Sequence, residues 1–164
     1  MRHPRNQKTT TSIALLITSD TRTIDEDETG QAAIELLESK GHKIICRDIM
    51  PNNPQKITHW LMESIEGKAR VIITSGGTGI GKVDVTVDSA TRLFDKEITG
   101  FGEHFRRLSY DEVGIPGIIS RATAGVSGKK LIFCLPGSKE AVKMALTEII
   151  LPGLGHMIWE LDRR

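Results

Sequence analysis

Residues 71–86, V-I-I-T-S-G-G-T-G-I-G-K-V-D-V-T, contain the transition that decides the fold of this chain. An apolar, β-branched run at 71–73 ends in Thr74 and Ser75. Three glycines then follow within four residues, namely Gly76, Gly77 and Gly79. Glycine adopts positive φ easily and lets a ligand approach the main chain, so successive N–H groups of such a loop can face an anion. The stretch therefore predicts a phosphate-binding loop at the carboxyl end of a central strand.

A carboxylate and a hydroxyl follow this loop, at Asp84 and Thr86, just before a helical segment that begins near Val87. An acidic residue in this position can cap the helix N-terminus, which typically contributes about 1 kcal/mol. The same residue can also act at the mouth of the loop, where a phosphate would bind. The residues alone leave both roles of Asp84 open.

Short apolar runs elsewhere predict further strands of the same sheet. They cover 12–18, 43–49, 118–122 and 130–135, and the strand before the glycine loop covers 70–75. Apolar residues at helical spacing lie between the strands, at 32–37, 57–65, 87–94, 100–108 and 141–150, with a break at Pro152-Gly153 and a second segment at 154–161. Strands that alternate with helices predict an α/β fold with a mostly parallel central sheet and helices on both faces.

Polar residues follow three of these strands: Ser19 and Asp20 after the first, the turn 51–53 after the second and 136–138 after the last. The carboxyl ends of parallel strands meet at one edge of a sheet, and open α/β folds bind ligands there. We therefore expect these residues to line the same site as the glycine loop. Four acids at 25–28 suit the positive end of the first helix, and a metal-binding role for them is the alternative.

The length of 164 residues fits one domain, which we place at 12–164 after a polar, flexible tail at 1–11. The formal net charge is +1, from 22 Lys and Arg against 21 Asp and Glu. This balance predicts neither nucleic acid nor an anionic membrane as a partner. The tail lacks an apolar signal region and no run approaches the ~20 apolar residues of a membrane span. We expect a soluble, cytoplasmic protein.

Two familiar nucleotide-binding patterns do not fit. Residues 76–82 match G-x-x-x-x-G-K, but the next position, which should offer a hydroxyl to magnesium, is Val83. The dinucleotide-binding pattern G-x-G-x-x-G fails because its last position is Lys82.

The sequence shows no pattern for nucleophilic or metal catalysis. It contains no G-x-S-x-G segment, and its five histidines lack the spacing of metal ligands. His42 and His156 each lie beside a glycine, where we expect helix ends. Cys46 and Cys134 stand singly in apolar runs, so we expect two buried thiols in a reducing compartment.

Several segments together strongly resemble the MoaB/Mog family of molybdenum-cofactor biosynthesis proteins. They are T-S-G-G-T-G-I-G-K-V-D-V-T at 74–86, G-F-G-E-H-F-R-R-L-S at 100–109, I-I-S-R-A at 118–122 and L-P-G-S-K-E-A-V at 135–142. Shorter agreements are I-T-S-D at 17–20, D-E-T-G at 27–30, L-L-E-S-K-G-H at 36–42 and I-L-P-G-L-G-H at 150–156. The resemblance covers nearly the whole chain after residue 12, in the order of the family.

This resemblance implies a three-layer α/β/α domain that binds molybdopterin. In catalytic members the terminal phosphate of the pterin attacks the α-phosphorus of ATP in the presence of Mg²⁺, and pyrophosphate leaves. It also implies a homo-oligomer, a trimer or hexamer, to which the helix at 100–108 and the segment around Trp159 could offer apolar surface. The metal enters after this step, so the resemblance does not distinguish a molybdenum from a tungsten pathway.

Carried over position by position, the resemblance also implies the site residues. Asp84 matches the essential acid of the family, which we expect to bind magnesium and the ATP phosphates. Asn52 matches the other catalytic position, in the turn after the second strand. The residues that match substrate-binding positions are Ser19, Asp20, Ser75, Gly76, Gly77, Thr78, Gly79, Thr86, Pro136, Gly137 and Ser138. Ser138 can also cap the last helix.

The chain departs from the family pattern at two positions. Catalytic relatives commonly carry an acid where this chain has Asn52, and an amide oxygen brings no charge to a magnesium site. Val83 replaces a frequent arginine. The alternative function is therefore a molybdopterin-binding or carrier protein of the same family that does not adenylylate.

Overall fold

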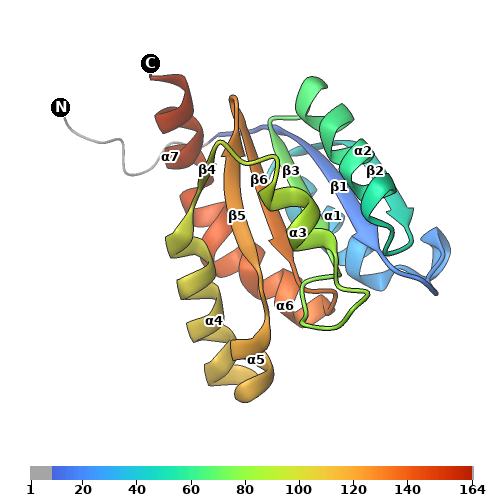
Figure 1. Cartoon of the computed structure of the whole chain (residues 1–164). Helices are drawn as coiled ribbons and strands as arrows, with labels where there is room; N and C mark the ends of the chain where they lie inside the picture. The colour runs from blue at the N-terminus through green and yellow to red at the C-terminus, as the bar shows by residue number, and fades with distance from the viewer. Residues whose placement is uncertain (1–8, 164) are drawn as a thin grey trace.

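Six strands form one sheet, in the order β2-β1-β3-β6-β5-β4, in the computed structural model, which describes residues 9–163 (Figure 1). The strands are β1 Ser12–Thr18, β2 Lys43–Met50, β3 Val71–Ser75, β4 Lys96–Glu97, β5 Thr123–Ser127 and β6 Lys130–Leu135. Strand β1 pairs in parallel with β2 and β3, and β3 pairs in parallel with β6. Strands β5 and β4 are antiparallel to their neighbours. The predicted mostly parallel sheet is confirmed.

Helices cover both faces of this sheet. They are η1 Ile24–Glu26, α1 Glu28–Ser39, α2 Pro54–Glu66, α3 Thr86–Thr91, α4 Thr99–Val113, α5 Ile115–Ile119, α6 Lys139–Met144, the π-helical turn η2 Ala145–Ile150 and α7 Leu151–Asp162. Alternate residues of one strand enter different cores: Leu15 packs with α1, α4 and α6–α7, whereas Leu16 packs with α2 and α3. Because both faces are buried, the central strands read as continuous apolar runs. This arrangement is the predicted three-layer α/β/α sandwich.

The predicted strand at 118–122 is wrong. Gly114 ends α4 with a φ of +71°, Pro116 lies in the first turn of α5, and Ile118 and Ile119 are exposed on that helix. Proline fixes a helical φ and suits a first turn, which favours the helix. The strand follows directly, as β5, and returns through a turn at Gly128 to β6.

The predicted break at Pro152-Gly153 is also wrong, because α6, η2 and α7 form one continuous helical run. Proline has no N–H for the preceding turn, and the wider π-helical turn before it absorbs this disruption. This run, Lys139–Asp162, is long and apolar enough by composition to cross a membrane. It buries Leu146, Ile150 and Leu154 against the sheet, as a core helix does.

The positions of the histidines and cysteines confirm some of the smaller predictions and correct others. His42 follows the end of α1, as predicted, but it is buried, and its Nδ1 accepts a hydrogen bond from Thr11 N at 3.3 Å. Thr11 belongs to the predicted tail at 1–11, of which residues 1–8 lie outside the described residues. His156 lies within α7 rather than at a helix end. Cys134 is buried as predicted, whereas Cys46 is only half-buried, and both thiols are free. Burial raises the pKa of each to about 11.

Candidate functional site

The glycine loop between β3 and α3 has positive φ angles at two of its glycines. Gly76 and Gly77 have φ angles of +107° and +65°. A Cβ on Gly76 would overlap the carbonyl oxygen of Thr18, and Gly76 N donates to Leu135 O at 2.9 Å. The loop therefore sits directly against the ends of β1 and β6 and tolerates no side chain at this point.

Two threonine hydroxyls support the loop from the protein interior. Thr86 is fully buried, its N–H donates to Gly77 O at 3.2 Å, and its Oγ1 lies 3.3 Å from Thr18 Oγ1. A Cβ on Gly77 would overlap Thr86 Oγ1. Thr78 is buried as well. These contacts make Thr86 a support of the loop.

Asp84 does not cap helix α3, which starts at Thr86 with Val85 in the capping position. Its carboxylate instead accepts a hydrogen bond from Gly81 N at 2.9 Å, and its own N–H donates to Gly81 O. A Cβ on Gly79 would lie 2.7 Å from Asp84 Oδ2. The carboxylate thus lies beside the second half of the glycine loop, half-buried, which is where a phosphate or its cation would meet it.

Arg121, to which the sequence analysis gave no role, holds this half of the loop. Its guanidinium donates to Gly79 O and Asp84 O, each at 2.8 Å, and pairs with both carboxylate oxygens of Asp88 at 2.9 and 3.0 Å. Its backbone N–H donates to Thr78 O. The pairing lowers the pKa of the Asp88 carboxyl. The only signal in the sequence was a single arginine in I-I-S-R-A, 37 residues after Asp84.

Asn52 and Asp20 form the opposite wall. Asn52 donates its backbone N–H and its Nδ2 to the two carboxylate oxygens of Asp20, at 2.9 and 3.0 Å. These hydrogen bonds lower the pKa of the Asp20 carboxyl. Asn52 Oδ1 is buried without a hydrogen-bond partner in the described part of the chain, and a Cβ on Gly77 would lie 3.0 Å from it. A buried oxygen without a donor is costly, so this position fits a ligand that supplies one or a cation.

The second loop, after β6, packs against the first. Ser75 is buried and donates its hydroxyl to Pro136 O at 2.9 Å, and a Cβ on Gly137 would lie 3.5 Å from Gly76 Cα. Ser138 caps α6 as expected, since its Oγ accepts from Ala141 N at 3.2 Å. Ser75 therefore joins the two loops rather than standing free at their entrance.

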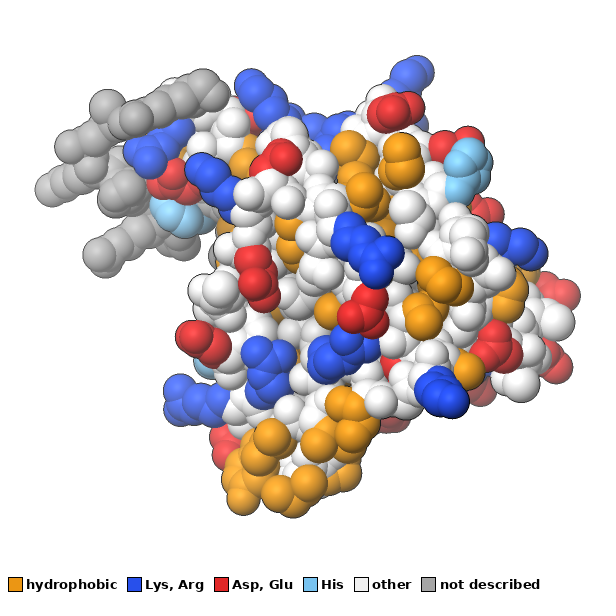
Figure 2. All heavy atoms as spheres, viewed as in Figure 1, with side chains coloured by type: hydrophobic (Ala, Val, Ile, Leu, Met, Phe, Trp, Pro, Cys, Tyr) orange, Lys and Arg blue, Asp and Glu red, His pale blue; other side chains and the backbone are white. Residues whose placement is uncertain are grey.

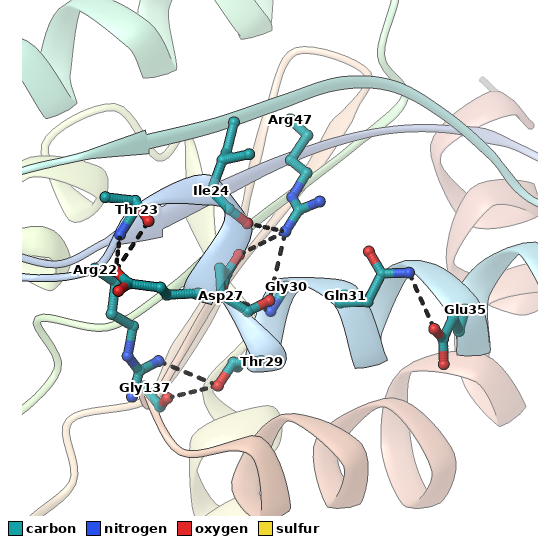
Figure 3. A network of polar contacts seen from close by, with 11 residues as sticks. Arg22, Thr23, Ile24, Asp27, Thr29, Gly30, Gln31, Glu35, Arg47 and Gly137 are labelled. Atoms are coloured by element: carbon teal, nitrogen blue, oxygen red, sulfur yellow. Dashed lines mark hydrogen bonds and ion pairs between the residues drawn. The ribbon is translucent and has the colours of Figure 1, made fainter.

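A polar network ties the first-strand edge to this second loop, and Figure 3 shows its part from Arg22 through Thr29 to Gly137. Ser19 Oγ accepts from Arg22 N at 3.0 Å, Arg22 Nη1 donates to Thr29 Oγ1 at 3.2 Å, and Thr29 donates to Gly137 O at 3.2 Å. The network places a guanidinium beside the second loop, which the sequence analysis did not anticipate.

The acidic run at 25–28 has a structural role. Asp27 caps α1 by accepting from Gly30 N at 2.8 Å, and its buried carboxylate pairs with Arg47 at 3.0 Å (Figure 3). Residues 9–163 contain no group of three or more His, Cys, Asp or Glu that could hold a metal ion. The metal-binding alternative for this run has no support.

The predicted site residues therefore meet at one edge of the sheet, but at two depths. Ser75, Gly76, Thr78 and Thr86 are buried and shape the loops. The site residues that are half-buried or exposed are Ser19, Asp20, Asn52, Gly77, Gly79, Asp84, Pro136, Gly137 and Ser138.

The donor set suits magnesium only together with a bound phosphate. Among residues 9–163, the site offers the Asn52 amide oxygen, which has no hydrogen-bond partner there, and the carboxylates of Asp84 and Asp20. Mg²⁺ commonly takes one or two carboxylates and completes its octahedron with substrate phosphates and water. The site is therefore compatible with a magnesium–nucleotide complex and less suited to the bare ion.

Comparison with known proteins identifies the family of this chain. Residues 14–156 match the model of the probable molybdopterin binding domain. Molybdenum cofactor biosynthesis protein B of Halalkalibacterium halodurans is 44% identical over 162 residues, which cover 97% of this chain and 95% of the relative.

Solved structures agree as well. The crystal structure of a molybdenum cofactor biosynthesis protein B superposes with a TM-score of 0.92 at 40% identity, over 97% of this chain and 100% of the other. The tungsten cofactor synthesizing protein MoaB from Pyrococcus furiosus superposes with a TM-score of 0.83 at 37% identity, over 93% and 97%. The chain therefore belongs to the molybdopterin-binding family of molybdenum and tungsten cofactor biosynthesis proteins.

Proposed function

We propose that this protein adenylylates molybdopterin with Mg-ATP. The observation that carries the proposal is the glycine loop with an oxygen ligand on each side. The Asp84 carboxylate lies beside Gly79, and the Asn52 oxygen without a partner lies beside Gly77. Such an arrangement suits two polyanions and a cation between them. Membership in the molybdopterin-binding family supports molybdopterin as one of the two polyanions.

In the proposed step a terminal phosphate oxygen of molybdopterin forms a bond to the α-phosphorus of ATP, and the bond from that phosphorus to the bridging oxygen of the β-phosphate breaks. Pyrophosphate leaves with the electron pair. A phosphate monoester is already ionised near pH 7, so no general base is needed. The protein's task is to position the reactants and to offset their charge.

The residues of the site divide this task. In the proposed complex the loop N–H groups and the Arg22 guanidinium bind phosphate oxygens, and Arg121, which donates to Gly79 O and Asp84 O, keeps this half of the loop in position. Asp84, with Asn52 opposite, would hold Mg²⁺. When bound, the ion would supply positive charge against the phosphates of ATP.

A transfer assay with ATP labelled at the α-phosphate tests the proposal. We expect labelled adenylyl-molybdopterin from the native protein and a loss of at least about 100-fold with Asp84→Asn. The asparagine variant keeps an oxygen for Gly81 N–H, so the loop should stay folded. Asp111→Asn, on the exposed side of α4, is the matched control and should retain full activity. If Asp84→Asn retains full activity, the assignment of Asp84 fails.

A second candidate function is supported by Asn52 itself. An amide in place of a carboxylate weakens a magnesium site, which favours a protein that binds molybdopterin without adenylylating it. The same assay separates the two functions. Tight pterin binding without any labelled product at saturating Mg-ATP would establish the carrier function.

We also propose a cytoplasmic homo-oligomer, a trimer or hexamer. Phe101 and Phe105 of α4 are buried inside the chain, so they offer no contact surface. Apolar side chains instead gather at the lower end of the molecule in Figure 2, which is the end where α5 lies in Figure 1. Val113, at the end of α4, and Ile115, at the start of α5, are 58% and 64% exposed. Light scattering coupled to size exclusion would give the oligomeric state, and a monomer would contradict this proposal.

A further inference from the structure

We propose that a cavity at the amino end of the sheet binds an amphipathic monocarboxylate, a ligand with an apolar body and a single carboxylate. The cavity has a volume of about 730 Å³, within the usual range for small-molecule sites. It lies between the C-terminal end of α1, the residues before β1 and the junction of η2 with α7. The inference concerns a second site and does not depend on the proposed function.

The cavity and the glycine loop lie at opposite edges of the sheet. Thr10 and His42, which line the cavity, come just before β1 and β2. Strands β1, β2 and β3 run parallel, and the glycine loop follows the last residue of β3, at the carboxyl edge. In Figure 1 the chain enters β1 at the upper end of the sheet, whereas the loop between β3 and α3 is at the lower end. A ligand in the cavity would therefore not meet the substrates of the glycine loop.

The helical run on this face gives the cavity an apolar wall. The lining residues on this run are Thr147, Leu151, Pro152, Leu154 and Gly155. The first of them belongs to the π-helical turn η2, which is wider than an α-helical turn, and such turns are frequent at functional sites. Gly155 brings no side chain into the space. The leucine and proline side chains therefore face a space that suits an apolar ligand body.

His42 gives the cavity a hydrogen-bond donor. The residue is only 7% exposed, and its Nδ1 accepts from Thr11 N at 3.3 Å. Burial lowers the pKa of the imidazole, which favours its neutral form. A neutral imidazole that accepts at Nδ1 carries its proton on Nε2. Within residues 9–163 the structure shows no acceptor for this second nitrogen, so a ligand oxygen would satisfy a buried donor.

The charge of the lining favours an anion. Lys40 is exposed and lines the cavity, and none of the described lining residues is acidic. A carboxylate accepts hydrogen bonds from an imidazole N–H and from an ammonium group, and such charge-assisted bonds are strong. An amine would instead meet the like charge of Lys40. Because the described lining offers one full positive charge, a monocarboxylate matches it better than a polyanion does.

Binding of 2-naphthoate and of its neutral analogue 2-naphthamide to the whole chain tests the inference. A ligand of this size with ordinary ligand efficiency has a Kd of about 1 mM or lower. We expect 2-naphthoate to reach this affinity in an NMR titration and to shift amide signals among residues 39–42 and 151–155. The neutral amide should bind the native protein at least about 5-fold more weakly.

Two lysine variants test the role of the charge. Lys40→Gln removes the ammonium group, so the affinity for 2-naphthoate should fall about 5-fold or more while that for 2-naphthamide stays unchanged. Lys56→Gln makes the same change at an exposed position of α2, which covers the other face of the sheet. This matched control should bind both compounds as the native protein does.

Two further measurements locate the ligand. Long-range ¹H–¹⁵N spectra of His42 should show the proton on Nε2, and this signal should move when 2-naphthoate is added. Thr147→Phe fills the cavity from an exposed helical position, where the native hydroxyl donates only to carbonyls of its own helical run. This variant should keep the native melting temperature and lose binding of both compounds.

Several results would overturn the inference. They are absence of 2-naphthoate binding by the native protein, equal affinity for the neutral amide, unchanged affinity in Lys40→Gln and unchanged binding by Thr147→Phe. Displacement of 2-naphthoate by Mg-ATP would also overturn it, because the compound would then occupy the glycine loop. Binding that depends on Lys40 and persists at saturating Mg-ATP would support a second site, whether or not the protein transfers an adenylyl group.

Discussion

Replacing Gly77 by alanine tests how the glycine loop is held. The φ of +65° at this position costs a residue with a side chain about 1–2 kcal/mol. The new Cβ would also overlap the Oγ1 of fully buried Thr86. Displacing that hydroxyl from its partner Thr18, or overpacking around it, costs about 1–3 kcal/mol more. We therefore expect Gly77→Ala to lower the free energy of unfolding by about 2–5 kcal/mol.

Gly128→Ala is the matched control for this variant. Gly128 has a similar φ of +55°, but a Cβ there would meet no atom within 4 Å. Only the conformational cost of about 1–2 kcal/mol applies. Urea denaturation followed by tryptophan fluorescence measures both variants under the same conditions. The difference between them isolates the overlap with Thr86, and if it is below about 0.5 kcal/mol, the reasoning about this hydroxyl is refuted.

Four further measurements probe the site and its surroundings. Arg121→Lys keeps the charge but loses the fork that reaches two carbonyls, so hydrogen exchange of amides 79–84 should accelerate about 10-fold; unchanged exchange would contradict this role. Asn52→Asp adds a carboxylate beside Asp20, so calorimetry should show tighter Mg-ATP binding, and weaker binding would argue against a magnesium role there. NMR titration should place the pKa of Asp20 below its ordinary value of 3.8, and Asn52→Ala, which removes the side-chain donor but keeps the backbone N–H, should raise the pKa only part of the way back. Because the folded pKa is the lower one, the contribution of Asp20 to stability is present above pH 3.8 and is lost as the pH falls through its lowered pKa. The pKa of Cys134 is raised to about 11, so iodoacetamide at pH 8 should leave this thiol unmodified in the native protein and alkylate it in urea; rapid native alkylation would refute its burial.

The layered fold was accessible to sequence reasoning because its determinants are local. The apolar run at 12–18 is buried on both sides, so its continuous hydrophobicity already predicts a central strand. Gly76 and Gly77 indeed take the positive φ angles that their spacing suggested. Gly79 does not have a positive φ, and its reason for being glycine is the neighbouring carboxylate of Asp84.

Contacts between segments that are distant in the sequence could not be predicted from the sequence in the same way. Ile118 and Ile119 have strand-like composition, yet they are exposed on a short helix, which a local pattern cannot distinguish from a buried strand. The position of Arg121 beside Gly79 depends on the packing of residues 42 positions apart. The position of the buried Asn52 oxygen beside Gly77 likewise becomes apparent only once β2 and β3 are placed on either side of β1.

The reversed direction of β5 has a consequence for how the chain can vary. Because β5 runs antiparallel to β6, the first residues of β5 and the preceding Arg121 lie beside the glycine loop. The last residues of β5 lie at the other end of the sheet, where the chain turns back at Gly128. A slip of one residue in this hairpin would turn successive side chains to the opposite face of the sheet. Such a slip would withdraw the guanidinium from Gly79 and Asp84 even if every residue of the loop were unchanged. Insertions that preserve the β5–β6 register should therefore be tolerated at the Gly128 turn, whereas those that shift it should disable the site.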